Sequence, residues 1–93
     1  MPVAVHIRPR QMSRDDYDHV IAELETSGHG SPEGRIFHAG YGDDQVQMFE
    51  VWESEDQFDA HRDELFSVIQ GAGVDAGTVE VHELHSTTAG GDL

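Results

Sequence analysis

Apolar and polar residues alternate along four stretches of the chain and follow a helical period along two others. Alternation with period two is typical of a strand with one buried face, whereas apolar residues at i, i+3, i+4 and i+7 are typical of an amphipathic helix. The pattern predicts six elements, in the order strand, helix, strand, strand, helix, strand. We place them at Val3–Arg8, a first helix that follows Ser13 and stops near Gly28, Arg35–Tyr41, Gln45–Glu53, Glu55–Gln70 and Thr78–His85.

The start of each helix carries a local signal. Ser13 and Ser54 stand where N-cap residues belong, and acidic residues follow both in the first turn, where the helix dipole favours negative charge. Gln57, three residues after Ser54, completes a capping-box spacing. The buried stripes are expected to be Tyr17, Val20, Ile21 and Leu24 in the first helix, and Phe58, Leu65, Val68 and Ile69 in the second.

The order of the elements predicts an α+β, ferredoxin-like βαββαβ fold. A turn at Gly42-Asp43-Asp44 makes the second and third strands an antiparallel hairpin. We expect a four-stranded antiparallel sheet with strands one and three in the centre and both helices on one face. Residues 1–93 would form one domain, with a core over about 3–85 and a flexible tail at 86–93.

The period-two pattern also assigns strand side chains to the two faces of the sheet. The face toward the helices is expected to carry Val3, Val5, Ile7, Phe49, Val51, Val79 and Val81. The opposite face would carry His6, Arg8, Met48, Glu50, Trp52, Glu80, His82 and Leu84. The second strand is ambiguous, and His38 joins the opposite face if Phe37 faces the helices. Because that face mixes apolar and polar groups, we expect two copies to stack their sheets into a dimeric α/β barrel.

Composition narrows the range of partners. The chain has 19 acidic residues, five arginines and no lysine, which gives a net charge of −14 and argues against binding to nucleic acid or an anionic membrane. Such acid-rich, lysine-free composition is also typical of proteins from high-salt cytoplasm. The absence of cysteine excludes disulfides and thiolate metal sites. With no apolar membrane span and no signal-peptide pattern, a cytoplasmic location is expected.

Histidines provide the first candidate chemistry. If the faces are assigned as above, His6, His38, His82 and Glu50 form a row across four neighbouring strands. Imidazole and carboxylate ligands suit zinc, iron or nickel, so the three histidines are candidate metal ligands. The alternative is a hydrogen-bonded polar layer inside a dimer.

Trp52 and His61 provide the second candidate, on either side of the corner between the third strand and the second helix. His61 follows Phe58 by three positions and so lies on the flank of the buried stripe, where a histidine can move protons near neutral pH. Alternatively, His61 is a half-buried structural residue and Trp52 fills a core or an interface. The face assignment puts Trp52 on the side of the sheet away from His61, so the two need not share a pocket.

The same corner carries a family resemblance. Val51-Trp52-Glu53-Ser54-Glu55, followed by Phe58 and His61, resembles the strand-to-helix corner of the dimeric α/β-barrel superfamily, and most closely its antibiotic-biosynthesis-monooxygenase-like (ABM-like) domains. The order and lengths of the elements extend this resemblance over about residues 3–85. It implies a homodimer with a ligand cavity in each protomer. At the position of His61, some haem-degrading relatives keep an iron-binding histidine.

The resemblance implies a cofactor-independent oxygenase of a small aromatic substrate, in which no cofactor is needed if the substrate donates an electron to oxygen. Trp52 would form a wall of the cavity, His61 would move protons, and Tyr17 or His38 would orient the substrate. Two alternatives stay open: a non-catalytic, small-ligand-binding or stress-associated dimer, and a metal-binding barrel. The chain has no asparagine, a residue that oxygenases and haem-degrading enzymes of this superfamily place beside the substrate.

Overall fold

The computed structural model describes residues 1–86 of the 93-residue chain, so most of the tail expected at 86–93 lies outside the described residues. The predicted order of six elements is confirmed. They are β1 (Val3–Arg10), α1 (Arg14–Thr26), β2 (Arg35–Tyr41), β3 (Gln47–Trp52), α2 (Glu55–Gly71) and β4 (Asp75–Glu83).

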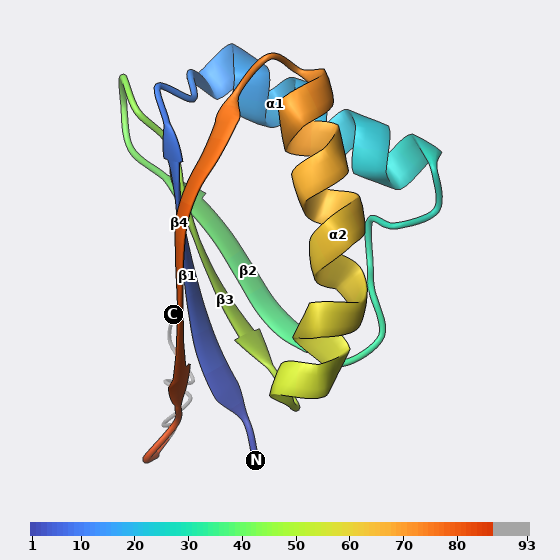
Figure 1. Ribbon diagram of the computed structural model, residues 1–93, viewed down its shortest axis with the longest axis vertical. Helices are drawn as coiled ribbons and strands as arrows, with labels where there is room; N and C mark the ends of the chain where they lie inside the picture. The colour runs from blue at the N-terminus through green and yellow to red at the C-terminus, as the bar shows by residue number, and fades with distance from the viewer. Residues whose placement is uncertain (87–93) are drawn as a thin grey trace, which may run out of the picture.

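The four strands form one antiparallel sheet in the order β2-β3-β1-β4, as predicted. Both helices lie on the same side of this sheet (Figure 1). Fully buried side chains from β1, α1, β3 and α2 meet between the layers and form a single core. The protein is therefore an α+β, ferredoxin-like domain with one covered and one open sheet face.

Both helix starts lie where the sequence places them. The Ser13 hydroxyl accepts a hydrogen bond from the backbone N–H of Asp16, whose carboxylate accepts one from the N–H of Ser13. This is a reciprocal capping box. The Ser54 hydroxyl accepts a hydrogen bond from the N–H of Gln57. These caps set the points where the chain turns from each preceding segment into a helix.

The edge strand β4 begins three residues before the predicted start at Thr78. Its pairing with β1 shifts register between Arg8 and Arg10, around the fully buried Pro9. Opposite this irregularity, Gly77 adopts a left-handed φ of 72°, and a Cβ on Gly77 would collide with the carbonyl oxygen of Arg8. A glycine at this position lets two backbones approach closely and lets β4 continue to Asp75.

The predicted faces are right for β1 and β4 and wrong for β3. Val5 pairs directly with Glu50 and Ile7 with Met48, so Met48, Glu50 and Trp52 face the helices. Phe49 and Val51 lie on the open face instead. The reason is that β3 carries bulky apolar residues at both parities, so its alternation does not reveal which face is buried, and a shift of one residue exchanges the faces. His38 pairs with Glu50 and shares the covered face.

The open face combines aromatic and charged groups. The rings of Phe37 and Phe49 pack edge to face, and His6 contacts both Phe49 and Tyr41. Phe37 and Tyr41 remain 51% and 46% exposed, which is unusual for large aromatic side chains. At the other edge, Arg8 forms an ion pair with Glu80. A patch of this kind is typical of an interaction surface.

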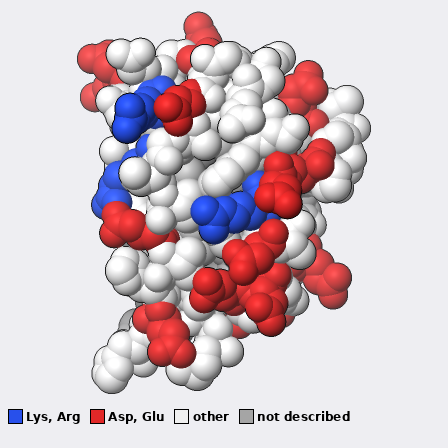
Figure 2. Space-filling model, in the orientation of Figure 1, with Lys and Arg blue, Asp and Glu red and all other residues white. Residues whose placement is uncertain are grey.

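Acidic side chains greatly outnumber basic ones on the face seen in Figure 2, where they gather toward the lower end of α2. Among residues 1–86, no helix combines the length and the apolar character that a membrane crossing requires.

Candidate functional site

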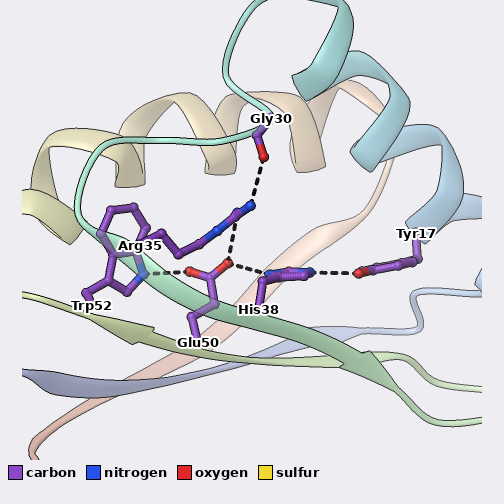
Figure 3. A network of polar contacts seen from close by, with 6 residues as sticks. All are labelled: Tyr17, Gly30, Arg35, His38, Glu50 and Trp52. Atoms are coloured by element: carbon purple, nitrogen blue, oxygen red, sulfur yellow. Dashed lines mark hydrogen bonds and ion pairs between the residues drawn. The ribbon is translucent and has the colours of Figure 1, made fainter.

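A buried carboxylate lies at the centre of the candidate site. Glu50, on β3, is only 1% exposed, yet each of its oxygens has a partner. The indole N–H of Trp52 donates to Oε1 at 2.8 Å, and Nδ1 of His38 lies 2.6 Å from Oε2. The guanidinium of Arg35 adds a cation 3.6 Å from Oε2. Figure 3 shows these side chains converging on the carboxylate from β2 and β3.

These contacts stabilise the ionised form of Glu50. Burial by itself raises the pKa of a carboxyl group, because the charged form loses hydration. In Glu50 the hydrogen bonds from His38 and Trp52, with the positive charge of Arg35, outweigh burial and hold the pKa below its usual value. Glu50 is therefore an anion at neutral pH, and acts as a hydrogen-bond acceptor only.

An ionised Glu50 fixes the tautomer of His38. A neutral imidazole has one N–H, and the carboxylate at Nδ1 requires that this nitrogen carry it. Nε2 then presents its lone pair to Tyr17, whose hydroxyl lies 2.7 Å away and donates to it. The two rings are nearly parallel. Burial, followed by the charge of Glu50, raises the pKa of Tyr17, so its phenol keeps its proton.

Arg35 connects this network to the loop that precedes β2. One guanidinium nitrogen donates to the carbonyl oxygen of Gly30 at 2.8 Å, while the other side of the group faces Glu50. The Arg35 side chain is only 17% exposed. The loop therefore lies against the site, held by the same cation that balances the charge of the buried carboxylate (Figure 3).

The network opens into a pocket of about 440 Å³ between α1, this loop and β2. Its polar wall includes Tyr17, Arg35 and His38, and its apolar wall includes Ile21, Leu24, Pro32, Ile36 and Phe37. The lining exposes more polar than apolar surface, so it combines several hydrogen-bonding groups with apolar side chains. Nε2 of His38 is the basic atom of the Glu50–His38 pair that points toward Tyr17 and this pocket, and we call the hollow the His38 pocket.

Trp52 and His61 do lie together, contrary to the expectation that the sheet separates them. Trp52 is fully buried under α2, with its ring 5.5 Å from that of His61 and 5.7 Å from that of Phe58. The change follows from the β3 register, which turns Trp52 toward the helices. His61 is 6% exposed, and its Nε2 has no hydrogen-bond partner among the described residues. Burial lowers the pKa of His61, which favours the neutral ring.

The predicted row of metal ligands is wrong. His38 faces the helices with Glu50, whereas His6 pairs with Phe49 and lies on the open face. His82 belongs to the open face too, where it is exposed and lies 3.5 Å from Glu80. Because the sheet separates His38 from the other two, the three histidines cannot bind one ion within a protomer. Residues 1–86 contain no cluster of three or more histidine or acidic side chains placed for a metal.

Of the four catalytic candidates, the structure joins Tyr17 to His38 by a hydrogen bond and places Trp52 one contact away, behind Glu50. His61 lies on the far side of Trp52 and does not line the His38 pocket. The sequence pattern does not indicate Arg35, and it places Glu50 in a row with His38 but on the wrong face of the sheet. The signal for Glu50 was a lone carboxylate inside the apolar segment 48–52, because a charge buried there needs partners.

Comparison with known proteins supports the fold. In sequence, the chain matches no protein-family model and no curated protein. In structure, it is similar to Rv0793 from Mycobacterium tuberculosis, with a TM-score of 0.65, 20% identity, and coverage of 96% of this chain and 100% of that one.

Two further structures are provisionally named antibiotic biosynthesis monooxygenases. The one from Deinococcus radiodurans has a TM-score of 0.62 at 9% identity, and the one from Chloroflexus aurantiacus has 0.55 at 16% identity. Each match covers 96% of this chain and 97% of the other. At such low identity the likeness establishes the fold alone. The chain therefore shares its ferredoxin-like fold with these three proteins.

Proposed function

We propose that the protein is a cofactor-independent oxygenase of a small aromatic substrate, with His38 as the general base. The observation that carries this proposal is the hydrogen-bonded line from the buried Glu50 through His38 to Tyr17, which ends at a pocket lined by both hydrogen-bonding and apolar side chains. A carboxylate that holds one imidazole nitrogen leaves the other as a proton acceptor in a fixed direction. General bases of this kind contribute roughly 10²–10⁴-fold to a rate.

Each residue of the network has a different role in this mechanism, set by its position. Glu50 fixes the orientation of His38 and stabilises the imidazolium that forms when Nε2 accepts a proton. Trp52 is a positioning residue for Glu50, because its indole N–H donates a hydrogen bond to Oε1, the carboxylate oxygen that does not contact His38. Tyr17 keeps its proton; in this scheme its hydroxyl turns from Nε2 of His38 to the substrate oxygen, which frees the Nε2 lone pair for the substrate proton. His61 has no part in this scheme, since it contacts the far side of Trp52 rather than the pocket.

The reaction balances with molecular oxygen as the only co-reactant. His38 removes a proton from an activated methylene group, and the resulting carbanion gives one electron to oxygen. The substrate radical and superoxide combine to form a C–O bond, and protonation gives a hydroperoxide. Loss of the second methylene proton breaks the O–O bond, so that the methylene becomes a ketone and one oxygen atom leaves as water. Oxygen accepts all four electrons that the methylene loses.

Anthrone is a direct probe, because this sequence converts it to anthraquinone and water. Oxygen consumption and anthraquinone absorbance are measured for the wild type and for His38→Gln. We expect the variant to lose about 10²-fold or more of the rate over background. His19→Gln is the matched control, because His19 is an exposed histidine on α1 and should keep the wild-type rate.

Two results would count against the proposal. Equal rates for His38→Gln and His19→Gln would remove His38 from the reaction. Binding of anthrone without oxygen uptake by the wild type would favour a non-catalytic ligand-binding protein instead.

We also propose that the open face of the sheet pairs with a second copy of the chain. Phe37 and Tyr41 are about half exposed there; Phe49 packs against both Phe37 and His6, and His6 contacts Tyr41 directly. Stacking two such faces would remove this aromatic surface from water and close a barrel. The charged pair Arg8–Glu80, at the β4 edge, would lie nearer the rim.

A further inference from the structure

Tyr17 separates two hollows on the surface of the protein. It lines the His38 pocket, of about 440 Å³, and a second pocket of about 340 Å³ between α1 and the β2–β3 turn. The second pocket includes Asp18, Gly40 and Val46 in its lining, and we call it the Gly40 pocket. Within residues 1–86, Tyr17 is the one residue that borders both. Its ring is thus the wall between them.

Two contacts hold this wall in place. At its tip, the hydroxyl of Tyr17 is bonded to Nε2 of His38 at 2.7 Å. At its flank, the ring lies directly on the backbone of β2 at Gly40, where a Cβ would come within 2.5 Å of Cζ and 2.7 Å of the hydroxyl oxygen. Any larger residue at position 40 would displace the ring. The absence of a side chain on Gly40 therefore lets Tyr17 reach His38.

We propose that Tyr17 determines substrate length by closing the His38 pocket, with Gly40 as the positioning residue that holds the tyrosine ring in that place. The inference rests on the proposed function for the nature of the ligand, a flat aromatic molecule. With the ring in place, a ligand that reaches His38 must fit into the first hollow. Without the ring, the two hollows join, and an aromatic ligand with an additional fused ring can extend over Gly40.

The test compares two probes of different length, 2-anthrol, which has the three rings of anthrone, and 2-hydroxytetracene, which has four, by isothermal titration calorimetry. The measured quantity is the ratio of their dissociation constants. Tyr17→Ala should shift this ratio toward the four-ring probe by about tenfold or more, the range found when a pocket gains or loses apolar contacts. Tyr17→Phe is the matched control, because it keeps the ring and removes only the hydroxyl; its ratio should equal that of the wild type.

Gly40→Ala gives an independent readout. It should weaken the contact between Tyr17 and His38 and shift the length ratio in the direction of Tyr17→Ala, whereas Gly71→Ala should leave the ratio unchanged because a Cβ there meets nothing within 4 Å. Circular dichroism confirms that each variant is folded before it is titrated.

An unchanged ratio in folded Tyr17→Ala would overturn the inference, as would failure of both probes to bind to either the wild type or that variant. The outcome is separate from that of the oxygenase test. A shifted ratio without oxygen uptake supports the role of Tyr17 in closing the pocket and rejects the oxygenase activity. Oxygen uptake with an unchanged ratio supports the oxygenase activity and rejects that role of Tyr17.

Discussion

The carboxylate of Glu50 and the imidazole of His38 are direct partners across the β2–β3 pair and lie 2.6 Å apart on the covered face of the sheet. A glutamine at position 50 offers one acceptor oxygen where two donors now converge, so either Trp52 or His38 would lose its partner. We expect Glu50→Gln to lower the free energy of unfolding by about 3 kcal/mol, the cost of breaking a buried charge pair. Urea denaturation measures this difference.

Glu80→Gln is the matched control for that change. Glu80 pairs with Arg8 on an exposed part of the sheet, and its removal should cost less than about 1 kcal/mol. If the two substitutions cost the same, the Glu50 network contributes little to stability.

The depressed pKa of Glu50 also predicts an acid-sensitive contribution to stability. Because the folded state holds the anion more strongly than the unfolded state, this contribution is complete above the usual carboxyl pKa of 4.5. It is lost as the pH falls through the lower, folded-state value. The stability difference between wild type and Glu50→Gln should therefore be constant from pH 7 to pH 5 and shrink in stronger acid. A difference that grows in acid would contradict this.

His61 predicts a second pH effect, in a higher range. Its buried ring has a lowered pKa, so below the usual value of 6.5 the unfolded chain binds a proton that the folded protein resists. Stability should fall as the pH decreases from 7 to 5, and His61→Leu should remove that part of the decrease. His19→Leu, on the exposed surface of α1, should retain it. Thermal unfolding at several pH values measures both.

Phe37 tests the proposed pairing of two open faces. Because its side chain is 51% exposed in one protomer, Phe37→Asp should disturb the protomer little but place a charge inside the proposed interface. We expect light scattering to give the mass of a dimer for the wild type and of a monomer for the variant. Ser67→Asp adds the same charge to an exposed position on α2 and should remain dimeric. A monomeric wild type would refute the pairing.

Gly77 and Gly71 form a natural pair for testing the β1–β4 contact. Gly77 has a left-handed φ of 72° and no room for a Cβ beside Arg8. Gly77→Ala should therefore destabilise the protein by more than about 1 kcal/mol. Gly71, at the end of α2, has open space around it, and Gly71→Ala should be neutral or stabilise by about 0.4–1 kcal/mol. If Gly77→Ala and Gly71→Ala change the stability equally, the close contact between β1 and β4 at Gly77 contributes nothing to stability.

The fold could be read from the sequence because its signals are local. Ser13 and Ser54 begin their helices through contacts with residues three positions away, and the turn at 42–44 determines the hairpin. The order of the strands then follows from the known βαββαβ topology.

Only part of the candidate site could be predicted from the sequence, because the site depends on how β3 pairs with β1, a strand distant in the sequence. Met48 and Phe49 are equally suited to a core, and only the pairing of Val5 with Glu50 decides which faces the helices. That choice brings Glu50 to His38 and Trp52 to His61, and it removes His6 and His82 from the same face. Tyr17 and His38 were recognised as candidates, whereas Arg35 gave no local pattern that would distinguish it from a surface arginine.

Trp52 is the only tryptophan of the chain, and its indole N–H is bonded to the carboxylate at the centre of the site. The protein thus contains a single indole fluorophore, which can be excited apart from the two tyrosines at the long-wavelength edge of its absorption, and we expect its emission to depend on the charge of its immediate neighbour. A proton or a ligand that changes the state of Glu50 should alter the wavelength or yield of that emission. Events at the site can therefore be followed in the unmodified protein, without an attached dye and without a second indole to obscure the signal.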